Sequence, residues 1–566
     1  MKRRQFLQSA AAAAVGVSTL ARAQEKPGTP AAAAQLQADI LIAGAGFSGL
    51  SAAVTAARSG ARVIVVEKRA YAGGDGILSA GIIASAHSVE HEAQKFQGKA
   101  DPEAYWSLLE RGIFDEPLSK VRDNMPLSPI YSGIFKHDPR VLRRSAQTSP
   151  EVVAFLKSFG VRFQPINPRQ PFLLPSVPGA MPAFAQAMLK ELERLRTPVM
   201  TNTAIVDLIT EPDPDPAACR GAVRVTGAVF ERDGRRLEVR AGAVILATGG
   251  FIDNMALLRR YKRFWADIPK GFSAVGEGVP PGHDGDGIRI GRLAGAALED
   301  MESMPKLFAA PRPGQKSPSW ILFDTDTAYL VDRNGRRFCN EHASRYAGCA
   351  LECFRKKIDG AFVVFDEAVF SGPNRSRWGY EALLKNGGLF KGETIAEAAQ
   401  RAGVSPEGLE KTLQTIARDA ASGRGDSQFG RRDSLFRALK GPYYVSTPGS
   451  TVRFKTKGGL EVNPDFNVLR AADDAPIPGL YAAGAVCGSI STRLCDVIAS
   501  GLIVGKTAAA GLRKPRPESG APCGPRPAGG RIWRNQAQKP QKGLDFSPFF
   551  IDNHAFPFGT WRAYLA

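Results

Sequence analysis

The sequence predicts an α/β fold built on a parallel sheet, and three observations support this prediction. An apolar run of strand length at 38–43 leads into a glycine-rich turn, a helix of small residues and a second apolar run at 61–66. Two later apolar runs, at 243–251 and 477–484, also end in glycine turns. The chain has 566 residues, of which 44% are hydrophobic and 23% charged, so it can bury a large core.

The first glycine turn has the spacing of a dinucleotide site. Gly44 permits a tight turn, Gly46 lets a pyrophosphate approach the backbone, and Gly49 allows the helix to pack closely on the strand. The N-terminal amides of that helix would face the phosphates. Glu67 ends the second strand and is placed to bind ribose hydroxyls, and its charge disfavours NADP because it would repel a 2′-phosphate. The segment therefore predicts a site for FAD or NAD.

Later glycine segments favour FAD over NAD. They lie at 73–81, 243–251, 285–295 and 477–484, and a helix-like stretch at 496–510 follows the last of them. An NAD site needs only one βαβ region. Contacts spread from residue 44 to about residue 500 indicate a long cofactor that runs through the whole domain.

In this order the segments resemble the flavoprotein family of fumarate reductases and succinate dehydrogenases, which includes flavocytochrome c fumarate reductases, urocanate reductases and 3-ketosteroid dehydrogenases. The resemblance covers about residues 36–512. It implies a discontinuous, Rossmann-like FAD-binding domain at 36–303 and 453–512. It also implies an inserted α+β capping domain at 304–452 that closes over the flavin and excludes water.

The resemblance also implies which residues contact FAD. They come from each of the glycine segments and from the residues around them: Gly44, Ala45, Gly46, Phe47, Ser48, Gly49, Glu67, Lys68, Gly74, Asp75, Ser79, Ala80, Gly81, Ile205, Ala247, Thr248, Gly249, Asp286, Gly484, Ala485, Arg493 and Leu494.

The segment 331–345 carries the catalytic candidates. Its Asn340-Glu341 pair is followed, four residues after the glutamate, by Arg345. In the family that this segment resembles, such an arginine delivers the proton while FAD N5 delivers hydride. A guanidinium hardly deprotonates, so Arg345 would need a relay, for which Glu341 and His342 are candidates. The i,i+4 spacing of Glu341 and Arg345 is equally typical of a helix ion pair.

The substrate residues follow the family pattern less closely. The family's substrate-binding histidine falls at Lys455, which could hold a carboxylate as a point charge, and His342 is a further candidate. A second carboxylate-binding arginine has no clear match, although Arg493 could take its place or contact the flavin. The family's flavin-side acid is Ala485 here. This incomplete dicarboxylate site disfavours fumarate itself.

We therefore expect an FAD-dependent oxidoreductase that reduces or forms a C=C bond next to a carboxylate or ketone. One alternative is a 3-ketosteroid dehydrogenase-type enzyme, in which tyrosines such as Tyr346, Tyr443 or Tyr444 would handle protons. Another is an FAD-binding electron-transfer or accessory protein without its own substrate.

Several absent motifs restrict cofactors and partners. No Cys-x-x-Cys-His motif occurs, so electrons must come from a separate carrier such as a cytochrome. The segment 75–81 lacks a histidine for a covalent flavin bond, which predicts non-covalent FAD. The six histidines show no zinc spacing, so no metal is expected. Cys349 and Cys353 are spaced to share one helix face, where core packing is favoured over a redox pair.

The first 23 residues predict export. Arg3 and Arg4 precede a short, weakly apolar run and a small-x-small cleavage site at 21–23, as in twin-arginine signal peptides. A flexible leader at 24–35 would follow. We therefore expect a periplasmic protein exported by the twin-arginine translocation machinery.

Charge and hydropathy exclude two further classes. Of the formal charge of +19, +4 lies in residues 1–23 and +6 in the Pro-, Gly- and base-rich tail at 513–566, so no nucleic-acid partner is expected. No stretch reaches about 18 uncharged apolar residues, so no stable membrane span is expected.

Overall fold

A computed structural model of the protein describes residues 36–513, except for 80, 99, 104, 106–137, 167–170, 216–218, 262–281, 302–305, 311–318, 321–326, 343–348, 350–351, 354, 373–379, 434, 454, 489 and 491–492. All described residues belong to the first of two compact units, which ends at Lys514.

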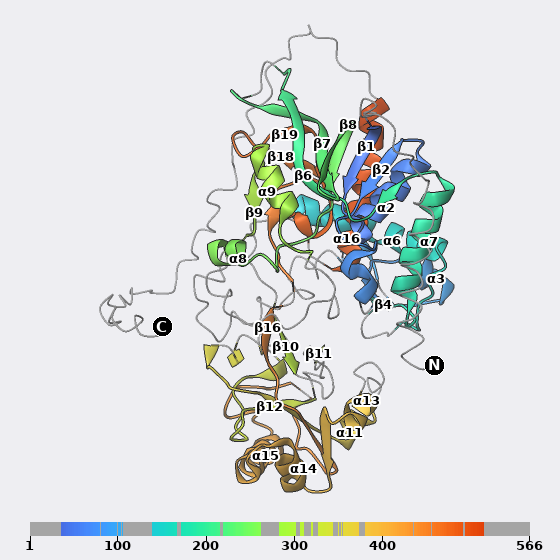
Figure 1. Ribbon diagram of the computed structural model, residues 1–566. Coiled ribbons are helices and arrows are strands. Elements are labelled where there is room, and N and C mark those ends of the chain that lie inside the picture. Colours follow the sequence, from blue (N-terminus) through green and yellow to red (C-terminus); the bar gives the residue numbers. More distant parts are fainter. Residues whose placement is uncertain are drawn as a thin grey trace, which may run out of the picture. The chain divides into compact units, whose positions relative to one another are not determined.

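The central feature is an eight-stranded sheet whose middle strands are parallel (Figure 1). Strand β1 pairs in parallel with β2 and β8, and β19 continues the parallel order beside β8. Strands β6 and β7 extend the sheet from β8 in antiparallel order. The α/β prediction is confirmed. The strands are β1 (Leu36–Ala43), β2 (Val63–Val66), β5 (Val199–Met200), β6 (Ala204–Pro212), β7 (Val223–Arg232), β8 (Arg235–Leu246), β18 (Asn467–Leu469) and β19 (Pro476–Ala482).

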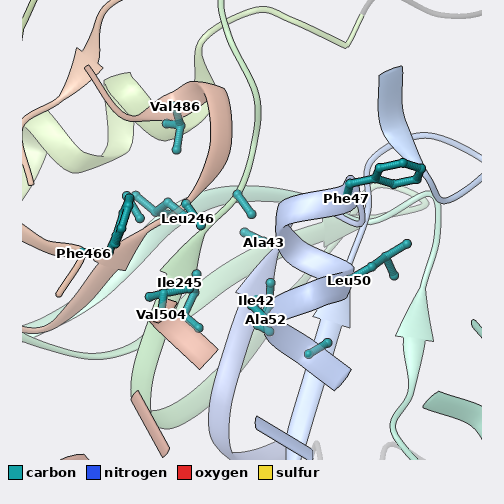
Figure 2. Packing of buried hydrophobic residues seen from close by; sticks show 14 of the residues in the cluster. Ile42, Ala43, Phe47, Leu50, Ala52, Ile245, Leu246, Phe466, Val486 and Val504 are labelled. Atoms are coloured by element: carbon teal, nitrogen blue, oxygen red, sulfur yellow. The ribbon is translucent and has the colours of Figure 1, made fainter. Parts of the chain in front are cut away.

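Helices packed on this sheet bury its apolar side chains. Strand β2 is buried along its whole length, β1 is buried over 40–43 and β8 over 243–246. Helices cover these stretches, which explains their near-continuous apolar runs. Figure 2 shows Leu50 of the first helix with Ile42 and Ile245 of the sheet and Val504 of the last helix. These four side chains are fully buried. The main helices are α2 (Phe47–Arg58), α6 (Pro139–Ser158), α7 (Ala180–Arg194) and α16 (Leu494–Arg513).

Small residues bring α2 and α16 into close contact. A Cβ on Gly501 would lie 2.3 Å from the carbonyl oxygen of Ser48, and one on Gly505 would lie 2.7 Å from that of Ala52. Only glycine allows the two backbones to approach this closely. The stretch Leu494–Leu512 is long and apolar enough to cross a membrane, but 67% of its apolar window is buried inside the protein. This burial is typical of the core helix of a globular fold.

Shorter elements surround the ends of the sheet strands. Four of them form two antiparallel pairs, β3 with β4 and β9 with β17. These elements are η1 (Gly74–Leu78), β3 (Ile82–Ala84), α3 (Val89–Ala93), β4 (Leu173–Pro175), α8 (Met255–Tyr261), α9 (Asp286–Leu293), β9 (Leu298–Glu299), β17 (Gly459–Leu460) and η2 (Gly484–Val486).

Between β9 and β17 the chain forms a segment with its own sheet and core. Strands β10 and β16 pair in antiparallel register, so the outgoing and returning chains run side by side. Beyond them lies a four-stranded sheet in the order β12-β13-β15-β14. The boundaries of the capping domain at residues 304 and 452 are not tested and stay a prediction. The elements are β10 (Lys306–Ala310), β11 (Ser319–Trp320), β12 (Tyr329–Val331), β13 (Phe362–Asp366), α11 (Glu367–Phe370), α13 (Tyr380–Lys385), β14 (Leu389–Gly392), α14 (Ile395–Ala402), α15 (Pro406–Ser422), β15 (Tyr443–Ser446) and β16 (Ser450–Arg453).

Candidate active site

The turn between β1 and α2 depends on its glycines in two different ways. Gly44 has a φ of +109°, and a Cβ there would lie 2.2 Å from the carbonyl oxygen of Ala247. A Cβ on Gly49 would lie 1.9 Å from the oxygen of Gly44. At Gly46, by contrast, a Cβ would meet no atom within 4 Å. Gly44 and Gly49 therefore allow neighbouring backbones to pack closely, where a side chain would clash. Gly46 instead borders an open space.

The N-terminus of α2 points its amides at that space. Its N-cap is Gly46, which offers no side-chain acceptor, and the first turn contains no acidic residue. The first N–H groups of a helix have no partner within the helix, so they can bind an anion. Gly73 of the second glycine turn forms a parallel bridge to Gly46, and a Cβ on Gly74 would lie 3.0 Å from the Cα of Gly46.

Glu67 is buried at the end of β2 and faces the same turn. Its Oε2 accepts a hydrogen bond of 2.9 Å from the N–H of Ala45, and its Oε1 accepts one of 2.9 Å from the N–H of Arg69. A carboxylate can accept about four hydrogen bonds, so these two leave acceptor capacity for ribose hydroxyls. The predicted place of Glu67 beside the dinucleotide turn thus agrees with the geometry.

Lys68 joins the segment after β2 to the start of α9. Its Nζ lies 2.5 Å from Oδ1 of Asp284 and 3.0 Å from Oδ2 of Asp286. Burial by itself raises the pKa of Asp284, but Lys68 outweighs burial and the pKa is lowered. The pKa of Asp286 is raised, chiefly by burial, with repulsion from Asp284 adding to it. Two predicted cofactor residues, Lys68 and Asp286, are therefore in contact.

A second charged pair links the same two segments. Nε2 of His283 lies 2.7 Å from Oδ2 of Asp75, and Nη1 of Arg69 lies 3.4 Å from Oδ1 of Asp75. Burial raises the pKa of Asp75, but the contacts with His283 and Arg69 outweigh burial and the pKa is lowered. His283 also packs on Gly249, since a Cβ there would lie 3.1 Å from Nδ1. Sequence reasoning missed His283, although it lies only three residues before Asp286.

The turn after β8 meets the segment that carries Lys455. The backbone N–H of Phe251 donates a hydrogen bond of 3.0 Å to Oγ1 of Thr456, the residue after Lys455. The hydroxyl Oγ1 of Thr248 is buried and has no hydrogen-bond partner within the described part of the chain. Buried hydroxyl groups usually have a hydrogen-bond partner. Since this one has none among the described residues, a bound ligand could supply the partner.

Phe47 and Ser48 have side chains in the core. The ring of Phe47 packs edge-on against Phe184, with 5.2 Å between the ring centroids. Oγ of Ser48 lies 3.5 Å from the carbonyl oxygen of Ala483, and a Cβ on Gly484 would lie 2.4 Å from that hydroxyl. Only the backbone amides of Phe47 and Ser48 are therefore placed to meet a cofactor.

The other predicted cofactor residues lie around the same strand ends. Oγ of Ser79 accepts a hydrogen bond from the N–H of Gly81. Ile205 is buried in β6, Ala485 lies in η2 and Leu494 begins α16. Ala80 lies outside the described residues.

Arg493, just before α16, is paired with an acidic residue in the first turn of that helix. Its Nε and Nη2 both lie 2.9 Å from Oδ2 of Asp496, which is buried. An i,i+3 pair at a helix start is a common structural contact. If Arg493 contacts the substrate or the flavin as predicted, it must do so while its guanidinium is paired with Asp496.

Glu341 lies in the interior of the inserted segment, with 0% of its surface exposed. Its Oε1 accepts hydrogen bonds of 3.0 Å from the N–H of Leu330 and from Nε of Arg337. Its Oε2 accepts one of 2.7 Å from Nη2 of Arg337, whose Nη1 donates to Asp426 at 2.8 Å. Arg345 lies outside the described residues. The geometry thus gives Glu341 a structural partner four residues earlier, and its relay role stays a prediction.

A histidine and three cysteines also lie in this inserted segment. Nδ1 of the partly exposed His342 lies 4.0 Å from Oδ2 of Asp433. Sγ of Cys339 lies 3.7 Å from Sγ of Cys349, and both thiols are buried. Cys353 is buried in the same hydrophobic cluster. Core packing of Cys349 and Cys353 is thus confirmed, but the thiol nearest to Cys349 comes from Cys339.

Comparison with known proteins assigns the cofactor. The chain matches the FAD binding domain family over residues 39–496. It belongs to this family. Together with the curated relatives, the match makes the chain an FAD-dependent oxidoreductase of the fumarate reductase and succinate dehydrogenase type, as the sequence predicted.

Named relatives share most of the chain. Probable fumarate reductase Ifc3 of Shewanella frigidimarina (strain NCIMB 400) is 25% identical over 489 residues, which are 83% of this chain and 74% of that protein. Urocanate reductase of Eggerthella lenta is 28% identical over 502 residues, 83% of this chain and 74% of that protein. The open conformation of a flavocytochrome c3 fumarate reductase matches in structure with a TM-score of 0.63 and 22% identity, over 91% of this chain and 82% of that one.

The described residues fit FAD. The open space at Gly46 and the uncapped amides of α2 suit the pyrophosphate, and Glu67 suits a ribose. The buried hydroxyl of Thr248 offers a further hydrogen bond. These groups lie at the carboxyl ends of β1, β2 and β8, where ligands of parallel sheets bind.

Proposed function

We propose that this flavoprotein reduces a C=C bond next to a carboxylate or ketone, or forms one in the reverse direction. The observation that supports this most directly is the extent of the family match, which includes both parts of the flavin fold and the inserted segment with its Asn340-Glu341-x-x-x-Arg345 sequence. The relatives Ifc3 and urocanate reductase are named for unsaturated acids.

The chemistry needs a hydride and a proton on opposite carbons of the double bond. Bound FAD supplies or accepts the hydride. In this proposal Arg345 donates the proton, and the buried Arg337–Glu341 pair fixes the backbone that precedes it. Lys455 would stabilise the negative charge that develops on the activating carboxylate or ketone oxygen.

The substrate class in this proposal is a monoanionic acid or a ketone. Lys455 replaces the family's substrate histidine, and Arg493 shares its guanidinium with Asp496. A dicarboxylate such as fumarate calls for two cationic partners, whereas an acrylate-type acid or an enone calls for one. FAD is held without a covalent bond in this proposal, because residues 75–81 contain no histidine.

The test is the anaerobic reoxidation of dithionite-reduced holoprotein by a panel of compounds. We expect rapid return of the oxidised flavin absorbance with an acrylate, a urocanate or an enone, and at least about tenfold slower return with fumarate. Saturated analogues of each compound serve as controls. Reoxidation by none of the alkenes, with rapid reoxidation by a cytochrome, would instead support the electron-transfer alternative.

The ketosteroid-type alternative depends on the tyrosines. Tyr444 is buried, and its hydroxyl donates a hydrogen bond of 2.6 Å to Oε2 of Glu367 within the inserted segment. This contact commits the hydroxyl to the core around α11 and gives no support to a catalytic role. Tyr443 is partly buried at the start of β15, and Tyr346 lies outside the described residues. A 3-ketosteroid in the reoxidation panel distinguishes this alternative.

We also propose that residues 1–23 direct export to the periplasm through the twin-arginine machinery. The support is the Arg3-Arg4 pair ahead of a weakly apolar run. Replacing both arginines with lysine should keep the protein in the cytoplasm, as measured by cell fractionation and immunoblotting. Lys2→Arg is the matched control and should be exported normally. Periplasmic recovery of the double-lysine variant would contradict the proposal.

A further inference from the structure

The segment after β2 and the segment before α9 are held together by charges. The first contains the FAD positions Glu67 and Asp75, and the second leads into Asp286. They are 208 residues apart at the contact between Asp75 and His283, yet that contact is 2.7 Å long. Lys68 of the first segment also forms ion pairs with Asp284 and Asp286 of the second. The two segments therefore meet on the side of the sheet where the cofactor binds.

The backbone just before Asp75 is a turn that packs against Gly46, which borders the open space at the start of α2. Gly73 and Gly74 have φ angles of +109° and +53°, and both contact Gly46. Asp75 follows at the start of η1. If this turn moves away from Gly46, the contact between Asp75 and His283 must break, because the carboxylate moves with the turn. The pair is thus placed to hold the turn in the position that encloses FAD.

The exposure of the pair fits a contact at the edge of the site. The Asp75 side chain is 41% exposed and that of His283 is 19% exposed. The Arg69 side chain is only 5% exposed and reaches Asp75 from the interior. Gly282, next to His283, leaves room for this guanidinium, since a Cβ there would lie 2.1 Å from Nε of Arg69. Arg69 and His283 therefore contact the same carboxylate from two sides.

We propose that His283 is a positioning residue for FAD, which holds the Asp75 turn closed over the cofactor and sets the rate at which FAD leaves. The inference rests on the FAD site and is independent of the substrate. The contact of 2.7 Å between Nε2 of His283 and the Asp75 carboxylate is short enough for a charge-assisted interaction, which can change a rate by about 10–100-fold. We assign that effect to FAD dissociation.

The experiment measures FAD release from purified holoprotein by the rise in flavin fluorescence after dilution. His283→Ala and Asp75→Ala should each accelerate release about 10–100-fold, and the double variant should be no faster than the faster single variant. His283→Gln keeps an N–H donor for Asp75 and should restore most of the wild-type rate. Gly282→Ala should accelerate release as well, by displacing Arg69 from the carboxylate.

A matched control is His87→Ala, because His87 is 44% exposed, lies 3.8 Å from Glu92 and is not among the predicted FAD contacts. It should leave release unchanged. Circular dichroism of each apoprotein checks that the variants fold.

The proposal would be overturned if His283→Ala released FAD at a rate within about twofold of the wild-type rate. It would also be overturned if the double variant accelerated release by the product of the two single accelerations. If the variants change FAD release as expected but the wild-type protein reduces no alkene, only the proposed reaction is contradicted.

Discussion

Replacing Arg345 with alanine is expected to lower kcat for alkene reduction by about 10²–10⁴-fold, while FAD stays bound. The reason is that hydride transfer cannot be completed without a proton for the second carbon, and alanine carries none. Arg345 lies outside the described residues, so the expectation derives from the sequence around Asn340 and Glu341. The measurement is steady-state turnover with the best alkene of the panel, with the flavin content read from the visible absorbance.

The matched control for this variant is Arg401→Ala. Arg401 also belongs to the inserted segment, but its side chain is 54% exposed and lies 4.0 Å from Glu397 on the surface of α14. Its loss should leave kcat within about twofold of the wild type. Arg345→Ala with near-normal turnover would show that the proton comes from another group.

Replacing Arg337 with methionine is expected to lower the free energy of unfolding by about 3–5 kcal/mol. Arg337 is fully buried and joins two carboxylates, since it lies 2.7 Å from Glu341 and 2.8 Å from Asp426. It also lies over the rings of Tyr329 and Phe429, 5.1 Å from each centroid. Methionine fills much of the volume but leaves Asp426 without this cation and Glu341 with only Arg431, whose Nη1 lies 3.8 Å from Oε2. Urea unfolding followed by circular dichroism measures the loss.

Two further variants show whether the loss is electrostatic. Arg337→Met combined with Glu341→Met removes one stranded carboxylate, so it should be more stable than the single variant, even though it carries an additional substitution. Arg401→Met removes an exposed i,i+4 partner and should cost less than about 1 kcal/mol. A double variant less stable than Arg337→Met would contradict the electrostatic explanation.

The backbone geometry of the first glycine turn was largely predictable from the sequence because its signals are local. Gly44, Gly46 and Gly49 are close in sequence, and their roles follow from backbone geometry within one turn. The parallel pairing of β1 with β2 and with β8 agrees with the predicted parallel sheet. Since the carboxyl ends of parallel strands meet at one edge, segments near residues 44, 67 and 248 had to converge there.

The ion pairs were predictable only in part, because spacing allows several partners. Glu341 could pair with an arginine four residues later or four residues earlier, and the structure describes the earlier one, Arg337. Cys349 was expected beside Cys353, yet the sulfur 3.7 Å away belongs to Cys339. Both choices depend on how the turn at 332–340 packs onto the rest of the inserted segment, which no local pattern specifies.

By itself the sequence determined the α/β class and the FAD family, because strand and turn patterns depend on neighbouring residues. Only the tertiary structure decided that His283 contacts Asp75 across 208 positions and that Thr456 accepts the N–H of Phe251 across 205. Such contacts arise when whole strands and helices pack together. Their distances therefore follow from the shape of the fold and not from the order of residues along the chain.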